Sequence, residues 1–146
     1  MIHNIRQPEI SDVNTIFDID LKSFEVPWDA SIWRVVCDDP QFNKLVATLF
    51  GVAVGFIIWK QTDSTDIWRF AVKPNYRGRG IGTSLIKAVR NYAIKNKSTL
   101  VILPVPEILC YTTDTGRWLN KQGFKASGII KGGDDVEDSI RFELKC

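Results

Sequence analysis

The chain has 146 residues, 45% of them hydrophobic and 25% charged, which is the size and composition of one ordinary globular domain. Its 19 basic and 17 acidic residues leave a net charge of +2, too small to indicate general binding to nucleic acid or to a membrane surface. The longest charge-free run, Leu45–Trp59, is shorter than the roughly 20 residues of a membrane-spanning helix. Three widely spaced cysteines form no disulfide or metal-binding pattern, so we expect a cytoplasmic protein without a metal.

The first half of the chain predicts a strand, two helices and a three-strand meander. We expect the first strand at Ile2–Arg6 and a second helix near Asp29–Cys37. Between them, Ser11 or Asp12 should cap a first helix. The apolar face of that first helix would consist of Val13, Ile16, Phe17, Ile19 and Leu21. Leu45–Leu49 and Val52–Lys60 should form a hairpin around Phe50–Gly51. A polar turn at Asp63–Thr65 then leads to a strand at Asp66–Val72.

The second half changes from strand to helix periodicity and back. Apolar residues at Ile81, Leu85, Val89 and Tyr92 predict an amphipathic helix, and Leu100–Val105 predicts an interior parallel strand. We expect a last helix at Thr113–Gln122 ended by Gly123, then strands at Phe124–Ile130 and Ser139–Leu144 around a loop at Gly132–Glu137. This order predicts one mixed α/β domain over residues 1–146.

One stretch, Val72–Ser84, joins a strand to the amphipathic helix and holds three glycines, Gly78, Gly80 and Gly82. Main-chain N–H groups of such a loop can converge on one anion at the positive end of a helix dipole. Arg77 and Arg79 add cations suited to phosphate oxygens. No Walker loop is present, and the dinucleotide fingerprint Gly-x-Gly-x-x-Gly is not matched. A glycine-rich helix start with solvated arginines is the alternative interpretation.

Residues 77–82 read Arg-Gly-Arg-Gly-Ile-Gly and match Gln/Arg-x-x-Gly-x-Gly/Ala, the signature of the GNAT superfamily of acyl-CoA-dependent N-acetyltransferases. The sequence resembles this family over nearly its whole length, including the Val-x-Pro strand end at Val72–Pro74. Three more segments resemble its ribosomal-protein N-terminal (alanine) acetyltransferase branch: Phe24–Trp28, Gln122–Phe124 and Asp138–Leu144. The resemblance implies an α+β fold with a mostly antiparallel sheet, helices on both faces and a splayed central pair of parallel strands.

The resemblance also implies acetyl-CoA as cosubstrate and a set of residues that would bind it. Main-chain N–H groups from Arg79 to Ser84 would hold the diphosphate, and the backbone of Phe70 and Val72 would pair with the pantetheine arm as an added strand. The N–H group of Val72 would stabilise the oxyanion, and the acetyl group would pass directly to an amine. The implied binding residues are Phe70, Val72, Arg77, Gly78, Arg79, Gly80, Ile81, Gly82, Thr83 and Ser84.

The sequence departs from this branch at the residues that transfer protons. The usual glutamate base and tyrosine acid are replaced by Pro104 and Leu119, neither of which carries a transferable proton, and Thr112 stands where an asparagine is expected. The substitutes that the sequence offers are Asp66, Glu107 and Tyr111. Each has a plainer interpretation: Asp66 as a turn cap, Glu107 as an exposed loop charge, and Tyr111 as a packing residue.

Other chemically capable residues receive weaker predictions. We expect Cys110 to be an inert thiol because no histidine partner is evident, and we assign His3, the single histidine, no role. Four tryptophans could line an acceptor pocket: Trp28, Trp33, Trp59 and Trp68. At least half of them should belong to the core instead.

The missing base favours one class of acceptor. Deprotonating a lysine at pH 7 costs about 4–5 kcal/mol, whereas an α-amine costs only about 1 kcal/mol. A protein or peptide N-terminus is therefore the favoured acceptor, with a small-molecule amine left open. The alternative of another class is a non-catalytic acyl-CoA-binding module, and we expect no nucleic-acid or membrane partner. The protein would be a monomer or a homodimer.

Overall fold

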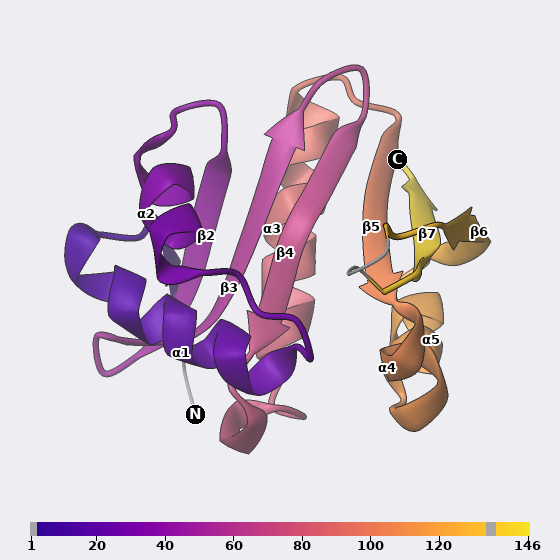
Figure 1. Ribbon diagram of the computed structural model, residues 1–146. Helices are drawn as coiled ribbons and strands as arrows, with labels where there is room; N and C mark the ends of the chain where they lie inside the picture. The colour runs from indigo at the N-terminus through magenta and orange to yellow at the C-terminus, as the bar shows by residue number, and fades with distance from the viewer. Residues whose placement is uncertain (1–2, 134–136) are drawn as a thin grey trace. The chain divides into compact units, whose positions relative to one another are not determined.

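The computed structural model describes residues 3–133 and 137–146 (Figure 1). Ile2, at the start of the predicted first strand, and 134–136, within the predicted loop, lie outside the described residues. The elements follow in this order: β1 Asn4–Arg6, the 3-10 turn η1 Ile10–Asp12, α1 Val13–Ser23, α2 Ala30–Asp38, β2 Asn43–Leu49, β3 Val52–Gln61, β4 Thr65–Val72, the 3-10 turn η2 Pro74–Tyr76, α3 Ile81–Lys95, β5 Leu100–Pro106, α4 Glu107–Thr112, α5 Thr115–Lys121, β6 Lys125–Ile130 and β7 Ser139–Lys145.

The strands of the described residues form a mixed sheet in the order β1-β2-β3-β4-β5-β7-β6. The β1–β2, β2–β3, β5–β7 and β6–β7 pairs are antiparallel, and β4 pairs with β5 in parallel. This parallel ladder is short, since it joins Thr65 to Val101 and Asp66 to Ile102 and no further pair of described residues. The mixed α/β fold is therefore confirmed.

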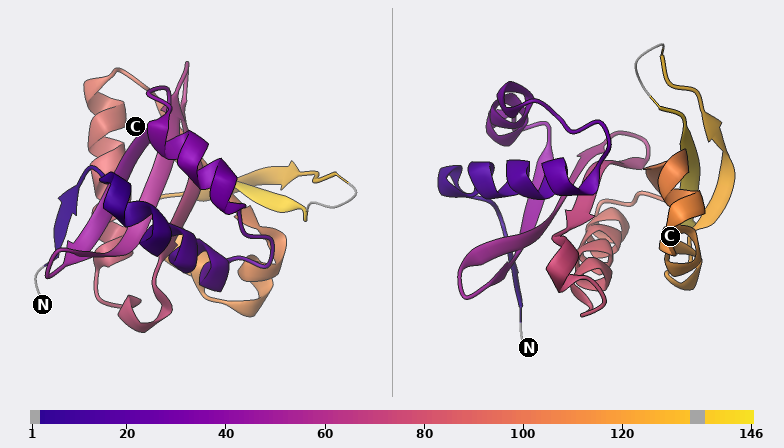
Figure 2. Two further views of the ribbon diagram at one scale, coloured as in Figure 1. Left: turned by 60° about the vertical axis from the view of Figure 1, so that its left-hand side comes forward. Right: turned by 60° about the horizontal axis from the view of Figure 1, so that its bottom comes forward.

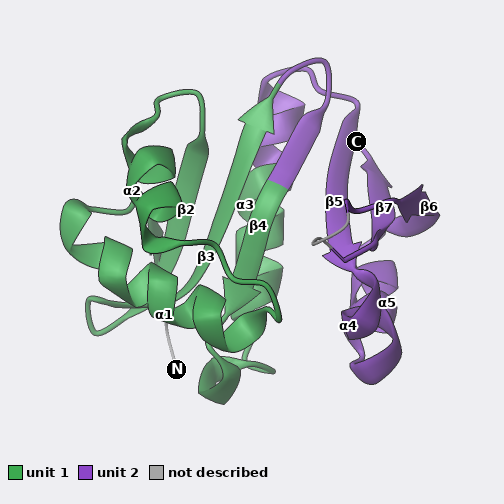
Figure 3. Ribbon diagram, viewed as in Figure 1, with its two compact units in different colours: residues 1–61, 68–89 green, residues 62–67, 90–146 purple. Residues whose placement is uncertain are grey.

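The chain divides into two compact units (Figure 3). The first unit contains 1–61 and 68–89, and the second contains 62–67 and 90–146. In the first unit, α1 and α2 cover one face of the strands and α3 covers the other (Figures 1 and 2). The core between α1, α2 and the strands includes Ile19, Trp33 and Phe56, each at most 1% exposed.

The local turn predictions are confirmed where glycine geometry decides them. Phe50 and Gly51 have φ of 52° and 80°, as the tight two-residue turn between β2 and β3 requires. Gly123 has φ of 100° directly after the last turn of α5, as a helix-ending glycine should. A Cβ on Gly123 would also lie 3.0 Å from Leu144 Cδ1, so both conformation and packing favour glycine there.

Two sequence predictions about helices are wrong, and one helix was not expected. Leu21, expected on the apolar face of α1, is 50% exposed. Asp12 stands at the N-cap position of α1, but its carboxylate accepts hydrogen bonds from the Arg6 guanidinium and the Glu9 N–H instead of capping that helix. The helix expected at Thr113–Gln122 is α5, Thr115–Lys121, and an unexpected helix, α4, precedes it at Glu107–Thr112, with Thr113 extended between the two.

Candidate functional site: the glycine loop and the start of helix α3

The connection from β4 to α3 contains the predicted anion-binding loop. Gly78 and Gly80 have φ of 78° and 85°, in the left-handed region that costs a residue with a side chain about 1–2 kcal/mol. A Cβ on either glycine would meet no atom within 4 Å. The demand for glycine therefore comes from the backbone conformation of the loop and not from crowding around it.

The hydrogen bonds of α3 show which N–H groups the helix itself uses. The first helical bond runs from the N–H of Ser84 to the carbonyl of Gly80, at 3.1 Å. The N–H groups at the very start of an α-helix, here those of 80–83, have no acceptor within the helix. Together with the helix dipole they form a place for an anion. We expected the Ser84 N–H group to bind the anion as well, but it donates to the Gly80 carbonyl within the helix.

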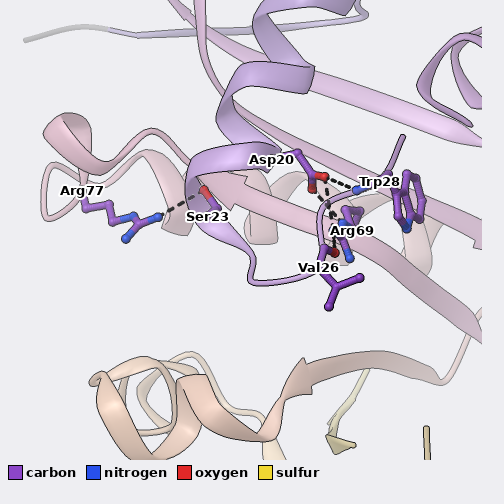
Figure 4. A network of polar contacts seen from close by, with 6 residues as sticks. All are labelled: Asp20, Ser23, Val26, Trp28, Arg69 and Arg77. Atoms are coloured by element: carbon purple, nitrogen blue, oxygen red, sulfur yellow. Dashed lines mark hydrogen bonds and ion pairs between the residues drawn. The ribbon is translucent and has the colours of Figure 1, made fainter. Parts of the chain in front are cut away.

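Arg77 joins the loop to two neighbouring elements. Its Nε donates to the carbonyl of Val72 at 2.9 Å, and its Nη2 donates to Ser23 Oγ at 3.2 Å, at the end of α1 (Figure 4). The guanidinium therefore holds the end of β4, the loop and α1 together. The sequence suggested a phosphate contact for Arg77, whereas these observed partners give it a structural task as well.

A residue that the sequence left without a role lies beside the loop. His3 Nε2 is 2.8 Å from Ser84 Oγ, and that hydroxyl donates its proton to the carbonyl of Gly80 at 3.1 Å. Because a hydroxyl has one proton, Ser84 Oγ accepts its second hydrogen bond from the His3 ring. No local pattern could have indicated this contact, which joins residues 81 positions apart.

The start of α3 lies close against the sheet. A Cβ on Gly55 of β3 would be 3.2 Å from the Ala71 carbonyl oxygen and 3.3 Å from Ile81 Cγ2. The Lys73 N–H group donates to the Val54 carbonyl at 2.7 Å and so ties the residue after β4 to β3. Gly55 thus permits the close approach that seats the first turn of α3 behind the end of β4.

Two candidate proton carriers, Glu107 and Tyr111, meet on α4 in the second unit. The Tyr111 hydroxyl donates to Glu107 Oε1 at 3.0 Å. This hydrogen bond and the adjacent negative charge raise the pKa of Tyr111. The alternative interpretation of Glu107 as a loop charge is wrong, since Glu107 is the first residue of α4, and Tyr111 lies in the same helix.

The remaining candidates have identifiable structural roles. Asp66 accepts hydrogen bonds from Ser64 Oγ at 2.7 Å and Thr62 Oγ1 at 3.4 Å, which is the turn cap considered as its alternative. Leu119, at the family's tyrosine position, is fully buried in α5. Pro104, at the glutamate position, pairs with Arg141 in the β5–β7 ladder. Both positions therefore serve the fold of the second unit.

Two of the four tryptophans belong to the core, and the three cysteines are free thiols. Trp33 and Trp59 are buried, whereas Trp68 is 48% exposed. The thiols of Cys37, Cys110 and Cys146 are free, and burial raises the pKa of Cys110, as expected of an unreactive thiol. Among the described residues no group of acidic, histidine and cysteine side chains could hold a metal ion. No helix in that part of the chain is long and apolar enough to cross a membrane.

The Glu107–Tyr111 bond leads to a prediction about pH. Glu107→Gln should lower the pKa of Tyr111 toward its ordinary value, because the neutral amide no longer opposes formation of the phenolate. Ultraviolet titration of tyrosinate measures this, with Tyr111→Phe variants subtracted to isolate the one phenol. If the titration of Tyr111 does not move, the pair does not form in solution.

Comparison with known proteins assigns the chain. The sequence profile of the acetyltransferase (GNAT) family matches residues 13–108, which includes α1 to β5 and the glycine loop. A candidate alanine N-acetyltransferase of ribosomal protein bS18 from Bacillus subtilis (strain 168) is 29% identical over 86 residues, covering 58% of this chain and 57% of that protein. L-2,4-diaminobutyric acid acetyltransferase from Nocardia farcinica (strain IFM 10152) is 34% identical over 88 residues, covering 57% of this chain and 46% of that protein.

The chain thus matches about half the length of these two relatives. Among solved structures, NAA60 of Arabidopsis thaliana in complex with acetyl-CoA superposes with a TM-score of 0.81 at 18% identity, covering 99% of this chain and 98% of that one. The likeness in fold extends over both units, and the family match includes the loop whose signature the sequence carries. The chain belongs to the acetyltransferase (GNAT) family, whose acetyl donor is acetyl-CoA.

Proposed function

We propose that the protein transfers the acetyl group of acetyl-CoA to a primary amine, and that the amine is the N-terminus of a protein or peptide. The observation that carries the proposal is the start of α3, where the N–H groups of 80–83 precede the first helical hydrogen bond and the loop before them turns at Gly78 and Gly80, both with positive φ. Such a loop suits a diphosphate, because the main-chain donors and the helix dipole act on the same anion.

The donor would be held by main chain more than by side chains. The diphosphate would rest on the N–H groups of Gly80, Ile81, Gly82 and Thr83, with Arg79 adding positive charge. The backbone of Phe70 and Val72 would pair with the pantetheine arm, and the Val72 N–H would donate to the thioester carbonyl as negative charge develops on its oxygen. Arg77 supports this arrangement because it fixes the Val72 carbonyl.

The transfer would be direct. The neutral amine attacks the thioester carbonyl, the C–N bond forms, the C–S bond breaks, and the departing thiolate takes up a proton while the amine loses one. An α-amine loses its proton more easily than a lysine does, by about 3 kcal/mol at pH 7. This preference supports an N-terminal acceptor for a chain whose family base and acid positions hold Pro104 and Leu119.

Glu107 and Tyr111 are the pair that we propose for proton transfer. Their side chains already share one proton-carrying hydrogen bond, and Tyr111 is exposed while Glu107 is partly exposed. A carboxylate can accept the amine proton, and a phenol with a raised pKa keeps its own proton to give to a thiolate. Asp66 is the weaker proposal, since its carboxylate already serves the β3–β4 turn.

A small-molecule amine is the second candidate acceptor. The 34% identity to L-2,4-diaminobutyric acid acetyltransferase supports it, because that protein's substrate is a free diamino acid. The two acceptors differ in size, so a single competition assay separates them. The cytoplasmic setting and the oligomeric state expected from the sequence stay predictions.

One experiment tests donor and acceptor together. Calorimetric titration with CoA should show saturable binding, and incubation with acetyl-CoA should release free thiol when peptides with free N-termini are added. The same peptides with a blocked N-terminus but a free lysine are the matched control and should release at least tenfold less. Absence of CoA binding would overturn the proposal. Turnover of diamino acids without turnover of peptides would replace the first acceptor by the second.

A further inference from the structure

A buried ion pair joins α1 to β4 in the first unit. The Arg69 Nε donates to Asp20 Oδ1 at 2.7 Å, and its Nη2 donates to Asp20 Oδ2 at 3.2 Å (Figure 4). The Asp20 side chain is fully buried, and that of Arg69 is 14% exposed. Two charges removed from water to this degree lose much of their solvation, and their mutual attraction need not exceed that loss. The pair therefore needs an explanation other than stability alone.

The same two side chains hold the segment Phe24–Trp28, which connects α1 to α2. Arg69 Nη2 donates to the Val26 carbonyl at 2.9 Å, and the Trp28 N–H donates to Asp20 Oδ2 at 2.7 Å. The Arg69 guanidinium also lies 3.9 Å from the centre of the Phe24 ring. One ion pair thus fixes this segment at its beginning, middle and end, while the Val26 side chain stays 49% exposed.

The position of Arg69 along β4 connects this segment to the reaction. Arg69 precedes Val72 by three residues, a rise of about 10 Å in an extended strand. Val72 in turn accepts from Arg77, which reaches Ser23 at the end of α1. Two arginines, one on β4 and one on the loop, therefore fasten the end of α1 and the segment after it to the strand that would carry the thioester.

We propose that Asp20 and Arg69 are positioning residues of the transfer reaction, which fix Phe24–Trp28 against β4 and so set where the acceptor amine meets the donor. The inference rests on the proposed function, since it needs the donor at the end of β4. The pair acts through the segment and touches neither substrate. Its loss should lower kcat and raise the KM for the acceptor, while the affinity for CoA stays the same.

The test compares variants that do not leave a buried charge unpaired. Asp20→Asn with Arg69→Gln removes both charges together and keeps an oxygen for the Trp28 N–H. The control is Asp12→Asn, which breaks another arginine–aspartate pair with a 2.7 Å contact, at the opposite end of α1 from Phe24–Trp28. Steady-state kinetics should show at least a tenfold loss of kcat/KM for the acceptor in the double variant and less than a twofold loss in the control. The dissociation constant for CoA should change less than twofold in either.

A second measurement keeps the test independent of folding. Hydrogen exchange of the amides of Phe24 and Trp28 should be at least tenfold faster in the double variant while the amides of β3 keep their wild-type protection. Equal kinetic losses in the double variant and the control would overturn the inference and leave the proposed function standing. A wild-type protein that binds CoA and acetylates no amine would overturn both.

Discussion

Replacing Gly78 and Gly80 together by alanine should weaken the binding of acetyl-CoA about 100-fold. Each glycine has a positive φ, and an alanine there costs about 1–2 kcal/mol. The cost is conformational, because a Cβ on either glycine meets no atom within 4 Å. We expect the free loop to escape it by moving both residues to negative φ. The bound loop cannot, because the N–H groups after Gly78 must point at one anion. The strain is then present only in the bound state, so each substitution lowers the affinity for acetyl-CoA roughly tenfold.

The control for this prediction is Gly128→Ala. Gly128 of β6 also has open space where its Cβ would lie, but its φ is not in the left-handed region. The substitution adds the same methyl group to a glycine without straining the backbone, so CoA affinity should stay within twofold of wild type. Calorimetry with CoA measures all three proteins. Unchanged affinity in the double alanine variant would mean that the loop does not hold the diphosphate.

Features that depend on a few adjacent residues could be predicted from the sequence. The β2–β3 turn at Phe50–Gly51 and the helix end at Gly123 follow from local backbone preferences, and the structure confirms both. The glycine loop was found in the same way, because strand, glycines and helix follow each other directly along the chain. Helix α4 was missed because Pro104 and Pro106 lie directly before it and because Thr113 interrupts the helical pattern after six residues.

Features that depend on distant residues could not be predicted. The Arg69–Asp20 pair joins residues 49 positions apart, and each residue taken alone is an ordinary charged side chain on a predicted strand or helix. The sequence places Asp20 on α1 next to apolar Ile19, but periodicity cannot tell a buried aspartate from one at the edge of the buried face. Likewise Leu119 was identified by its place in the family pattern, and only the structure shows that it packs in the core.

Asp20→Ala should destabilise the protein by roughly 3–5 kcal/mol, because it leaves the Arg69 guanidinium largely buried without its counter-charge. It also removes the acceptor of the Trp28 N–H. For a chain of this length each kcal/mol lowers the melting temperature by about 2–4 °C, so a loss of roughly 10 °C is expected. Thermal unfolding followed by circular dichroism measures it. The control is Asp18→Ala on the same helix, whose pair with Lys22 is about half exposed and should contribute less than about 0.5 kcal/mol.

Replacing both charged residues separates the cost of an unpaired charge from the value of the pair. Asp20→Leu with Arg69→Met leaves no buried charge, so the double variant should be more stable than Asp20→Ala, although the Trp28 N–H and the Val26 carbonyl still lack partners. If the double variant regains stability but not acceptor turnover, the ion pair serves the geometry of Phe24–Trp28. If it regains both, apolar packing at these positions is sufficient, and the charges have no positioning role.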